Sequence, residues 1–388
     1  MIVDIASSIA ARFSPSRRQL LKTTPALMAA AGAISSPASA QPMVGSSQPQ
    51  TQTAMPAPEL HDHNIVGFML AHEQFPVPEL VQLGTDASQA GFGALATSDH
   101  LQPWQSNEGH AGQAWVTLGL VGSRAPSSWI GTTVTCPTMR YNPAVVAEAF
   151  ASLSLLYPGR VFLGVGSGEA LNEEAAIGGW PRWPERWERL IEAISVIRAL
   201  WSGQEIRHQG KYYTVNAKLY DPPARPIPLL TAANGRKSMR LAGQYGDGLI
   251  TDPKTWKQYK TEWEEGASAA GKDPGRMPVL VEQFVVVGNE NDARQAAELW
   301  RFIPKAFKTY FNVPSPAEIE QLANNQIPLG QVIGAWPVST DPSVHIDKIN
   351  ELFDSGVNIV NIHSGQPDQR RVIAFYADYV LPNFRSRS

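Results

Sequence analysis

The feature of this sequence that most constrains its fold is a regular alternation of short apolar segments with helical patterns. The apolar segments are rich in aliphatic and β-branched side chains, and we count eight: residues 65–70, 94–97, 129–135, 161–165, 228–232, 247–251, 279–287 and 357–362. They are apolar along their whole length rather than at every second position. A strand of that kind is buried on both faces, which is typical of a parallel sheet.

Helical patterns lie between these segments, for example over residues 78–90 and 143–156. The clearest covers residues 184–201 and has one apolar stripe of Trp187, Leu190, Ile191, Ile194, Ile197 and Leu200. Eight βα units favour an α/β fold of the closed (β/α)8 TIM-type barrel over an open doubly wound sheet. Polar residues directly follow strands at 98–100 and 166–169, so we expect them at the carboxyl rim of the barrel, where catalytic sites form.

The first forty residues have the pattern of an export signal. An arginine pair, Arg17-Arg18, precedes a modestly apolar run over residues 23–34, and small residues close the segment at Ala38-Ser39-Ala40. The run is too short and too weakly apolar for a retained membrane span. Because Leu-Leu-Lys closely follows the arginine pair, the segment resembles a signal for the twin-arginine translocation machinery, which exports folded proteins, so we expect a location in the cell envelope. An ordinary secretory signal with two chance arginines is the alternative.

The sequence therefore predicts a signal over residues 1–40, a disordered linker over 41–60 and one folded domain over 61–388. The net charge of −3 and the isoelectric point near 6.3 argue against a nucleic-acid-binding protein. Cys136 is the only cysteine, so the chain has neither a disulfide framework nor a cysteine that could carry a lipid after the signal. We expect its stability to come from a large apolar core.

A glycine-rich turn, Gly164-Val165-Gly166-Ser167-Gly168, follows the fourth apolar segment. It lacks the third glycine of the G-x-G-x-x-G pattern, and no acidic residue ends a clear next strand, so the sequence argues against a dinucleotide-binding fold. The glycines either end the strand in a tight turn or let the backbone approach a flat or phosphorylated cofactor.

Three long motifs occur in a characteristic order: SDHLQPW over residues 98–104, RYNPA over 140–144 and YPGRVFLGVGSGEALNE over 157–173. They resemble the deazaflavin-dependent branch of the bacterial-luciferase-like superfamily. This branch includes the coenzyme F420-dependent glucose-6-phosphate dehydrogenases and the exported F420-dependent hydroxymycolic acid dehydrogenases. The resemblance extends over residues 65–371, nearly the whole expected domain. It implies a TIM-type barrel, usually a homodimer, that holds coenzyme F420 at the carboxyl rim.

Oxidising an alcohol with a deazaflavin requires a base for the hydroxyl proton, an acid near a ring nitrogen and a dry face for the hydride. His100 suits the base, because an imidazole titrates near neutral pH. Glu169 suits the acid, because a buried carboxyl group retains its proton more readily. Trp104 offers a water-excluding wall, and Glu73 is a further polar group at the rim. Taken singly, His100 is more often a turn residue, Glu169 a helix cap, Trp104 a core residue and Glu73 a surface residue. The joint motif outweighs these alternatives, and the resemblance implies the same catalytic roles.

The resemblance also implies the residues that bind the cofactor. It places a cis peptide bond between Thr133 and Val134, under the ring. Cys136 stands where the family has a threonine, which leaves that contact open, and residues 232–235 resemble the phosphate-binding end. The implied cofactor-binding residues are Asp99, His100, Thr133, Val134, Cys136, Gly168, Glu169, Asn172, Ala232, Ala233, Asn234 and Gly235. No metal site is predicted.

Departures from the sugar-phosphate dehydrogenases indicate a different substrate. Those enzymes hold the phosphate with two lysines and an arginine; Lys254 matches the first lysine, but Tyr310 and Ala335 fall at the other two positions. Losing two cations removes most charge-assisted binding of a phosphate. The nearby sequence is apolar instead, with Trp300, Phe302, Ile303, Phe307, Tyr310, Phe311 and Trp336. This cluster forms either a core or dimer interface or a channel for a lipidic secondary alcohol, such as a hydroxymycolic acid that is oxidised to the ketone.

Three other functions fit the sequence less well. A flavin mononucleotide-dependent monooxygenase on the same fold is disfavoured, because His100, Trp104 and Glu169 together suit dehydrogenation. An F420-dependent sugar-phosphate dehydrogenase is disfavoured by the lost cations. A solute-binding protein is disfavoured by the barrel pattern, because such proteins have two open α/β lobes.

Overall fold

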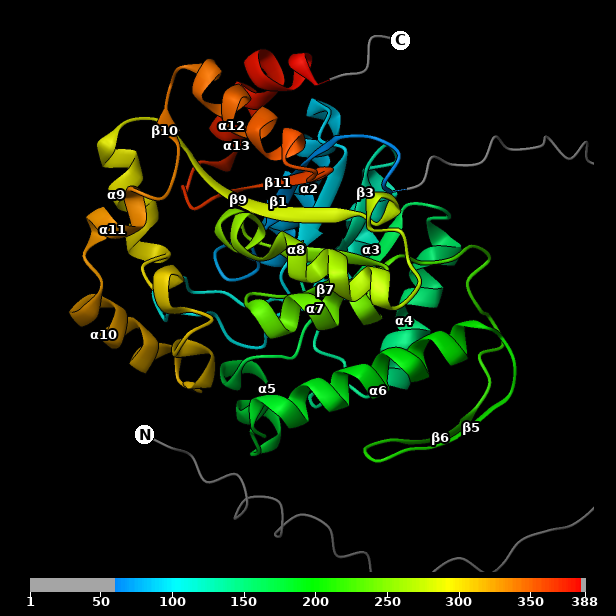
Figure 1. Ribbon diagram of the computed structural model, residues 1–388. Coiled ribbons are helices and arrows are strands. Elements are labelled where there is room, and N and C mark those ends of the chain that lie inside the picture. The colour runs from blue at the N-terminus through cyan, green and yellow to red at the C-terminus, as the bar shows by residue number, and fades with distance from the viewer. Residues whose placement is uncertain (1–59, 385–388) are drawn as a thin grey trace, which may run out of the picture. The chain divides into compact units, whose positions relative to one another are not determined.

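The computed structural model describes residues 60–384, and the expected export signal, with almost all of the expected linker, lies outside the described residues. Eight parallel strands form a closed barrel in the order β1-β2-β3-β4-β7-β8-β9-β11, and β11 pairs again with β1 (Figure 1). These strands are β1 Ile65–Leu70, β2 Ala94–Thr97, β3 Trp129–Thr132, β4 Val161–Val165, β7 Leu229–Ala232, β8 Gly248–Thr251, β9 Val279–Val287 and β11 Ile359–Ser364. The predicted (β/α)8 barrel is confirmed.

Helices surround the barrel and connect its strands. They are α2 Val77–Ala90, α3 Ala114–Arg124, α4 Pro143–Leu156, α5 Ala170–Ile177, α6 Trp183–Trp201, α7 Arg236–Tyr245, α8 Pro253–Ala269, α9 Glu290–Leu299, α10 Pro316–Gln326, α11 Leu329–Ile333, α12 Pro342–Asp354 and α13 Gln369–Phe375. Short turns of 3-10 or π helix cover Pro274–Arg276, Ile303–Lys305, Tyr310–Asn312, Tyr376–Val380 and Leu381–Asn383. None of the helices within residues 60–384 is long and apolar enough to cross a membrane.

The helix ends agree with local sequence signals. The Asn142 side chain accepts a hydrogen bond from the Ala144 amide, and Pro143 occupies the first position of α4. Asp252 caps α8 in the same way, and its carboxylate accepts from the Lys254 and Thr255 amides. Both caps mark the start of the helix that follows a strand, and Asp252 does so directly after β8.

Two apolar layers hold the barrel together. One fills the barrel interior, with side chains from seven of the eight strands: Met69, Ala94, Ala96, Phe162, Leu230, Ile250, Leu280 and Ile359. The other lies between the strands and the surrounding helices and includes the expected stripe of α6, with Trp187, Leu190, Ile194, Ile197 and Leu200 buried. Ile191 of that stripe is only half-buried.

A third apolar cluster lies apart from these layers, in the segment between β9 and β11. It joins α9, α10 and α11 (yellow to orange in Figure 1) to the rim residues Ala71, Trp104 and Leu171. We call residues 290–336 the excursion. It contains the aromatic residues for which the sequence allowed two interpretations, a core or interface and a substrate channel.

Several expected boundaries were wrong. The third strand ends at Thr132 rather than at residue 135, because the chain turns there toward the rim and Thr135 donates its hydroxyl to Asp99. A two-stranded antiparallel hairpin, β5 Ile206–Gln209 with β6 Thr214–Ala217, and a short strand, β10 Val338–Ser339, were not expected. These strands are short and polar or half-exposed, so they lack the apolar signal that marked the barrel strands. Other ends differ by one or two residues.

Candidate active site

A chamber of about 310 Å³ opens at the carboxyl ends of the strands. Four sequence-predicted residues, Glu73, His100, Trp104 and Thr133, line it together with Met69 and Ser98. The opposite wall comes from Asp252, Pro253, Lys254, Glu282, Gln283, Phe284, Trp300, Phe302, Ile303, Ala306, Phe307, Ala335, Trp336, Lys348 and His363. The chamber thus has a polar wall after β1 and β2 and a largely aromatic wall from β9 and the excursion.

The imidazole of His100 and the carboxylate of Glu73 form the centre of the polar wall. His100 Nε2 lies 3.5 Å from Glu73 Oε1, and both side chains are nearly buried. The Ser98 hydroxyl donates to the other oxygen of Glu73 at 2.6 Å. His100 Nδ1 lies 3.2 Å from the Gln102 carbonyl oxygen, an acceptor, and 3.3 Å from Asn172 Nδ2, a donor, so Nδ1 has a partner in either tautomer. In the tautomer with the proton on Nδ1, Nε2 can accept a proton beside a carboxylate that stabilises the resulting imidazolium.

Trp104 connects this polar centre to the aromatic wall. Its ring stacks on Phe302 at 4.8 Å with an interplanar angle of 16°, and it meets the edge of Phe307 at 5.8 Å. The His100 ring is also 5.8 Å away. Trp104 is buried in the third apolar cluster and also lines the chamber. It is therefore both a core residue and a wall of the site, and it excludes water from the side of His100 that faces the excursion.

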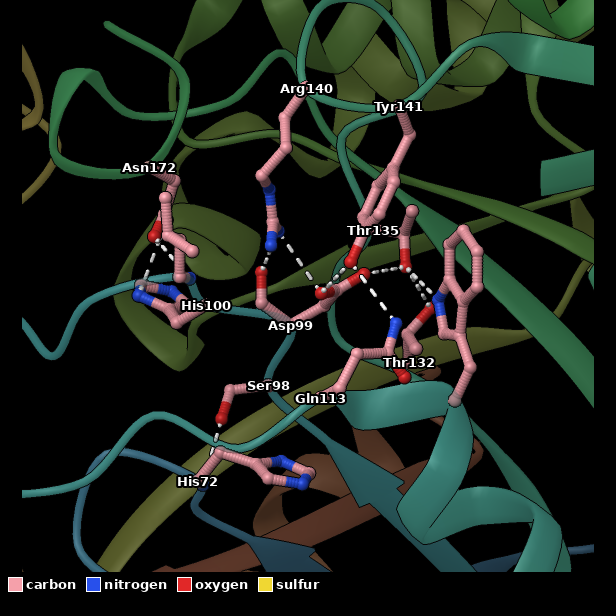
Figure 2. Close-up of polar contacts among 12 residues, drawn as sticks. His72, Ser98, Asp99, His100, Gln113, Thr132, Thr135, Arg140, Tyr141 and Asn172 are labelled. Carbon is pink, nitrogen blue, oxygen red and sulfur yellow. Dashed lines mark hydrogen bonds and ion pairs between the residues drawn. The ribbon is translucent and has the colours of Figure 1, made fainter. Parts of the chain in front are cut away.

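Asp99, expected among the cofactor contacts, is engaged by protein groups (Figure 2). Its carboxylate accepts from Arg140 Nη2 at 3.0 Å, from the Tyr141 hydroxyl at 3.2 Å and from the Thr135 hydroxyl at 2.6 Å. Burial, followed by the negative charge of Asp99, raises the pKa of Tyr141 to about 12, so this phenol keeps its proton and donates. The Asp99 carbonyl oxygen also accepts from Arg140 Nη2, at 2.9 Å, so the network fixes the strand end from which His100 projects.

The predicted acid, Glu169, stands at the N-terminus of α5 and is half-buried. It does not line the chamber, and its connection to His100 runs through Asn172. Asn172 Nδ2 lies 3.4 Å from Glu169 Oε2 and 3.3 Å from His100 Nδ1. The Asn172 carbonyl oxygen accepts from the Leu101 amide at 2.8 Å. Asn172 therefore links the two motifs that carry the predicted acid and base.

One buried carboxyl group beside these motifs was not singled out from the sequence. Glu173 is 1 % exposed, accepts from the Arg140 amide at 2.7 Å and lies near its guanidinium. Burial outweighs these contacts and raises the pKa of Glu173 to about 7. Its place inside the YPGR…NE motif was the available signal, but no sequence pattern indicated that Glu173 is buried rather than on the exposed face of α5.

A second cavity, of about 90 Å³, lies on the other side of the glycine-rich turn. It brings together four predicted cofactor residues, Gly168, Ala232, Ala233 and Asn234, and Gly235 follows as the cap of α7. Arg186 of α6 lines the same cavity and was missed by the sequence analysis. Its guanidinium lies over the Trp180 ring at 4.0 Å, and its Nε is buried without a partner among the described residues. A buried cation with a free donor at a helix N-terminus suits an anionic group.

The residues that the resemblance places under the cofactor ring pack closely against the glycine-rich turn. The peptide bond between Thr133 and Val134 is cis, as the family resemblance implied. A Cβ at Gly166 would lie 2.6 Å from Val134, and Gly168 has a φ of +78°, so neither position accepts a larger residue without a shift. Cys136 is buried, contacts the Thr138 hydroxyl, and has a thiol pKa well above its usual value because of burial. Its thiol packs behind Gly168.

The aromatic residues of the excursion divide between two roles. Trp300, Phe302, Ile303, Phe307 and Trp336 line the chamber, and Ala335 stands among them. Tyr310 is 2 % exposed and belongs to the third apolar cluster, outside the chamber lining, while Phe311 lines the second cavity. The two interpretations left open by the sequence are therefore both partly right. Lys254 lines the chamber as expected, and Lys348 of α12 does so as well, which the sequence did not indicate.

The closed barrel and the polar site at its carboxyl rim are those of an oxidoreductase. Residues 56–357 match the family described as luciferase-like monooxygenase, and the chain belongs to this family. The closed barrel excludes the two-lobed architecture of a solute-binding protein and the open sheet of a dinucleotide-binding fold.

Several relatives within this family are similar to the chain over most of their length. The F420-dependent hydroxymycolic acid dehydrogenase of Mycobacterium tuberculosis is 47 % identical over 323 residues, covering 82 % of this chain and 88 % of that protein. The F420-dependent glucose-6-phosphate dehydrogenase of Microbacterium testaceum is 37 % identical over 328 residues, covering 83 % and 97 %. A solved structure of an F420-dependent secondary alcohol dehydrogenase with an F420–acetone adduct has a TM-score of 0.78 and 32 % identity, covering 84 % of this chain and all of that one.

Proposed function

We propose that this protein is an F420-dependent dehydrogenase that oxidises a lipidic secondary alcohol to a ketone, with hydroxymycolic acid as the leading candidate. The observation that carries the proposal is the chamber, in which the His100–Glu73 pair faces a wall of aromatic side chains. F420-dependent oxidation of alcohol groups is also the activity named for its relatives.

The residues present can hold coenzyme F420. The second cavity, with Arg186 and the N-terminus of α7, suits its anionic part, and the surface around Gly166 and the Thr133–Val134 bond suits its ring. When bound, the deazaflavin supplies a two-electron acceptor that takes a hydride at a ring carbon and a proton at a ring nitrogen.

The protein groups then divide the proton chemistry. His100 Nε2 accepts the hydroxyl proton of the alcohol, and Glu73 Oε1 at 3.5 Å stabilises the imidazolium. Asn172 holds one oxygen of Glu169, which leaves the other to carry the proton that the acid supplies. Trp104 and Phe302, stacked on each other, keep water away from the carbon that loses the hydride.

The lipidic nature of the substrate is supported by what surrounds this centre. Tyr310 is buried away from the chamber and Ala335 lines it without a charge, so neither replaces a phosphate-binding cation. Lys254 makes no ion pair among the described residues but is exposed, and Lys348 is already 2.9 Å from Glu351. An exposed pair to a phosphate contributes only about 0–1 kcal/mol. By contrast, an alkyl chain of the substrate that packs against the aromatic wall contributes about 0.8 kcal/mol of binding free energy per buried methylene.

The direct test compares substrates under the same conditions. Reduction of F420 is followed spectroscopically with glucose 6-phosphate and with secondary alcohols of rising chain length. We expect kcat/KM to rise with chain length and no useful turnover of the sugar phosphate. Efficient oxidation of glucose 6-phosphate, or no gain with chain length, contradicts the lipid assignment but leaves the use of F420 intact. A flavin mononucleotide-dependent monooxygenase would instead bind FMN and consume oxygen.

We also propose that the twin-arginine machinery exports the folded protein to the cell envelope. The support is the arginine pair Arg17-Arg18 ahead of a short, weakly apolar run. Replacing both arginines by lysines should retain the precursor inside the cell while the enzyme still binds F420. Undiminished export of that variant contradicts the proposal.

A homodimer is proposed from the outer faces of α3 and α4. Val116 and Leu120 on α3 are 59 % and 47 % exposed, and Leu156 at the end of α4 is 65 % exposed. The Tyr157 hydroxyl donates to the Gly119 carbonyl, so these two helices adjoin. A shared apolar face of this kind is typical of a subunit interface. The double variant Val116→Lys, Leu120→Lys should sediment as a monomer, whereas a wild-type protein that is already monomeric contradicts the proposal.

A further inference from the structure

The chamber contains a second histidine–carboxylate pair that the alcohol chemistry does not use. His363 lies near the end of β11 and Glu282 lies in the neighbouring strand β9, and both line the chamber. His363 Nδ1 bonds to Glu282 Oε1. The pair belongs to the wall formed by β9 and β11, whereas the His100–Glu73 pair follows β1 and β2.

The surroundings hold this pair in one orientation. The His363 ring stacks on Phe284 at 4.1 Å with an interplanar angle of 25°, and it meets Trp300 at 4.3 Å with an angle of 78°. His363 is 1 % exposed, and its Nε2 is buried without a partner within residues 60–384. The ring is therefore fixed by aromatic contacts, and its bond in turn fixes the carboxylate of Glu282.

One oxygen of Glu282 remains open. Oε1 is engaged by His363, but Oε2 has no hydrogen-bond partner in the described part of the chain. The side chain is 28 % exposed at the chamber wall. Lys254 and Lys348 line the same chamber, yet neither forms an ion pair with Glu282. A carboxylate in such a position accepts hydrogen bonds and cannot donate them, so it favours a ligand that brings a donor.

We infer that Glu282 is a specificity-determining residue whose Oε2 accepts a hydrogen bond from a second hydroxyl group of the alcohol substrate. His363 is its positioning residue. This inference rests on the proposed function and narrows it: the substrate is a polyfunctional lipid alcohol rather than a plain secondary alkanol. Its oxidised hydroxyl lies at His100, its second hydroxyl lies at Glu282, and its chain packs against the aromatic wall.

The test uses matched alcohols with the F420-loaded wild-type protein. The probes are 2-octanol, the octanediols with a second hydroxyl at C4, C5 or C6, and the O-methyl ether of each second hydroxyl. A charge-assisted hydrogen bond predicts a KM on the order of tenfold lower for the best diol than for its ether, with kcat within about twofold. The ether removes the donor but also adds a methyl group, so the same pair must be compared in a variant without the carboxylate to separate hydrogen bonding from size.

Glu282→Gln turns the acceptor into an amide that can still accept from His363 while its NH2 group faces the chamber. In this variant we expect the KM ratio of ether to diol to fall to about one. Glu290→Gln, on the exposed face of α9, is the control and should keep the wild-type ratio. A wild-type ratio near one for every diol, or a ratio that survives Glu282→Gln, overturns the inference.

A readout without turnover separates this inference from the proposed function. Trp300 and Trp336 line the chamber, so quenching of their fluorescence reports binding of the same probes. If neither these probes nor the longer alcohols of the chain-length series are oxidised, the proposed function fails. The ratio of the dissociation constants for ether and diol then tests the role of Glu282: it should be about ten in the wild type and about one in Glu282→Gln.

Discussion

The two walls of the chamber are built in different ways. The polar wall is anchored on barrel strands, and its carboxylates are held by neighbours: Glu73 by Ser98, and Asp99 by Arg140, Tyr141 and Thr135. The aromatic wall comes mostly from the excursion, which has an apolar cluster of its own and meets the barrel through Trp104 and Leu171. On the proposed function, the barrel carries the residues of the proton chemistry and the excursion carries those that contact the substrate chain.

The largest effect should come from the polar wall. His100→Ala should lower kcat by roughly 10²–10⁴-fold while F420 still binds, because the variant has no acceptor for the hydroxyl proton. Glu169→Gln should also slow F420 reduction. Stopped-flow reduction and F420 titration measure the two quantities, and His208→Ala in the outer hairpin is the control. Near-normal turnover in both variants would show that the division between the walls is wrong.

The polar wall should also respond to pH, through Glu173. Its pKa of about 7 is above the usual 4.5, so the folded state holds this proton more tightly than the unfolded state does. The stability that Glu173 contributes is present at low pH and is lost as the pH rises from about 4.5 to about 7. Glu173→Gln should therefore gain on the order of 2 kcal/mol relative to the wild type between pH 5 and pH 8. Urea unfolding at both pH values measures this, and the more exposed Glu174→Gln should show little change.

A substitution in the aromatic wall should have a smaller effect on activity than one in the polar wall, and it should change KM rather than kcat. Trp336 stacks on Phe284 at 5.3 Å with an interplanar angle of 12° and lines the chamber. Trp336→Ala should raise the KM for long-chain alcohols about tenfold and leave kcat nearly unchanged, since binding along the chain is removed equally from the ground and transition states. A fall in kcat of similar size would place Trp336 in the catalytic machinery.

The smallest effect should come from Phe307, which is 55 % exposed and lines both cavities. Phe307→Ala should raise the KM for long-chain alcohols about two- to threefold, because a half-exposed ring buries little chain, with no loss of thermal stability. A tenfold effect would mean that this ring is covered when substrate binds. Initial rates across the alcohol series, together with a melting curve, test this.

The sequence predicted the barrel because its strands are apolar throughout, and it placed His100, Glu73, Trp104 and Thr133 around one chamber. The sequence could not show that Asn172 lies between Glu169 and His100, because a motif specifies the order of residues but not the direction of their side chains. Glu282 lies inside the strand expected over residues 279–287 and His363 directly follows the one expected over 357–362, and neither was singled out from the sequence. Their meaning depended on the pairing of β9 with β11, which local patterns do not reveal.

The hydrogen bonding that closes the barrel has a consequence for how the protein is made. β1 pairs in register with β11, and the Asn358 side chain bonds to the Leu60 carbonyl, 298 residues earlier. During synthesis, β1 can pair with β2 early, but it cannot pair with β11 until almost the entire domain has been made. Contacts of such long range are slow to form and leave a strand edge open in the meantime. Folding is completed only after β11 has been synthesised, and a chain that stops before residue 359 keeps an unclosed, aggregation-prone sheet.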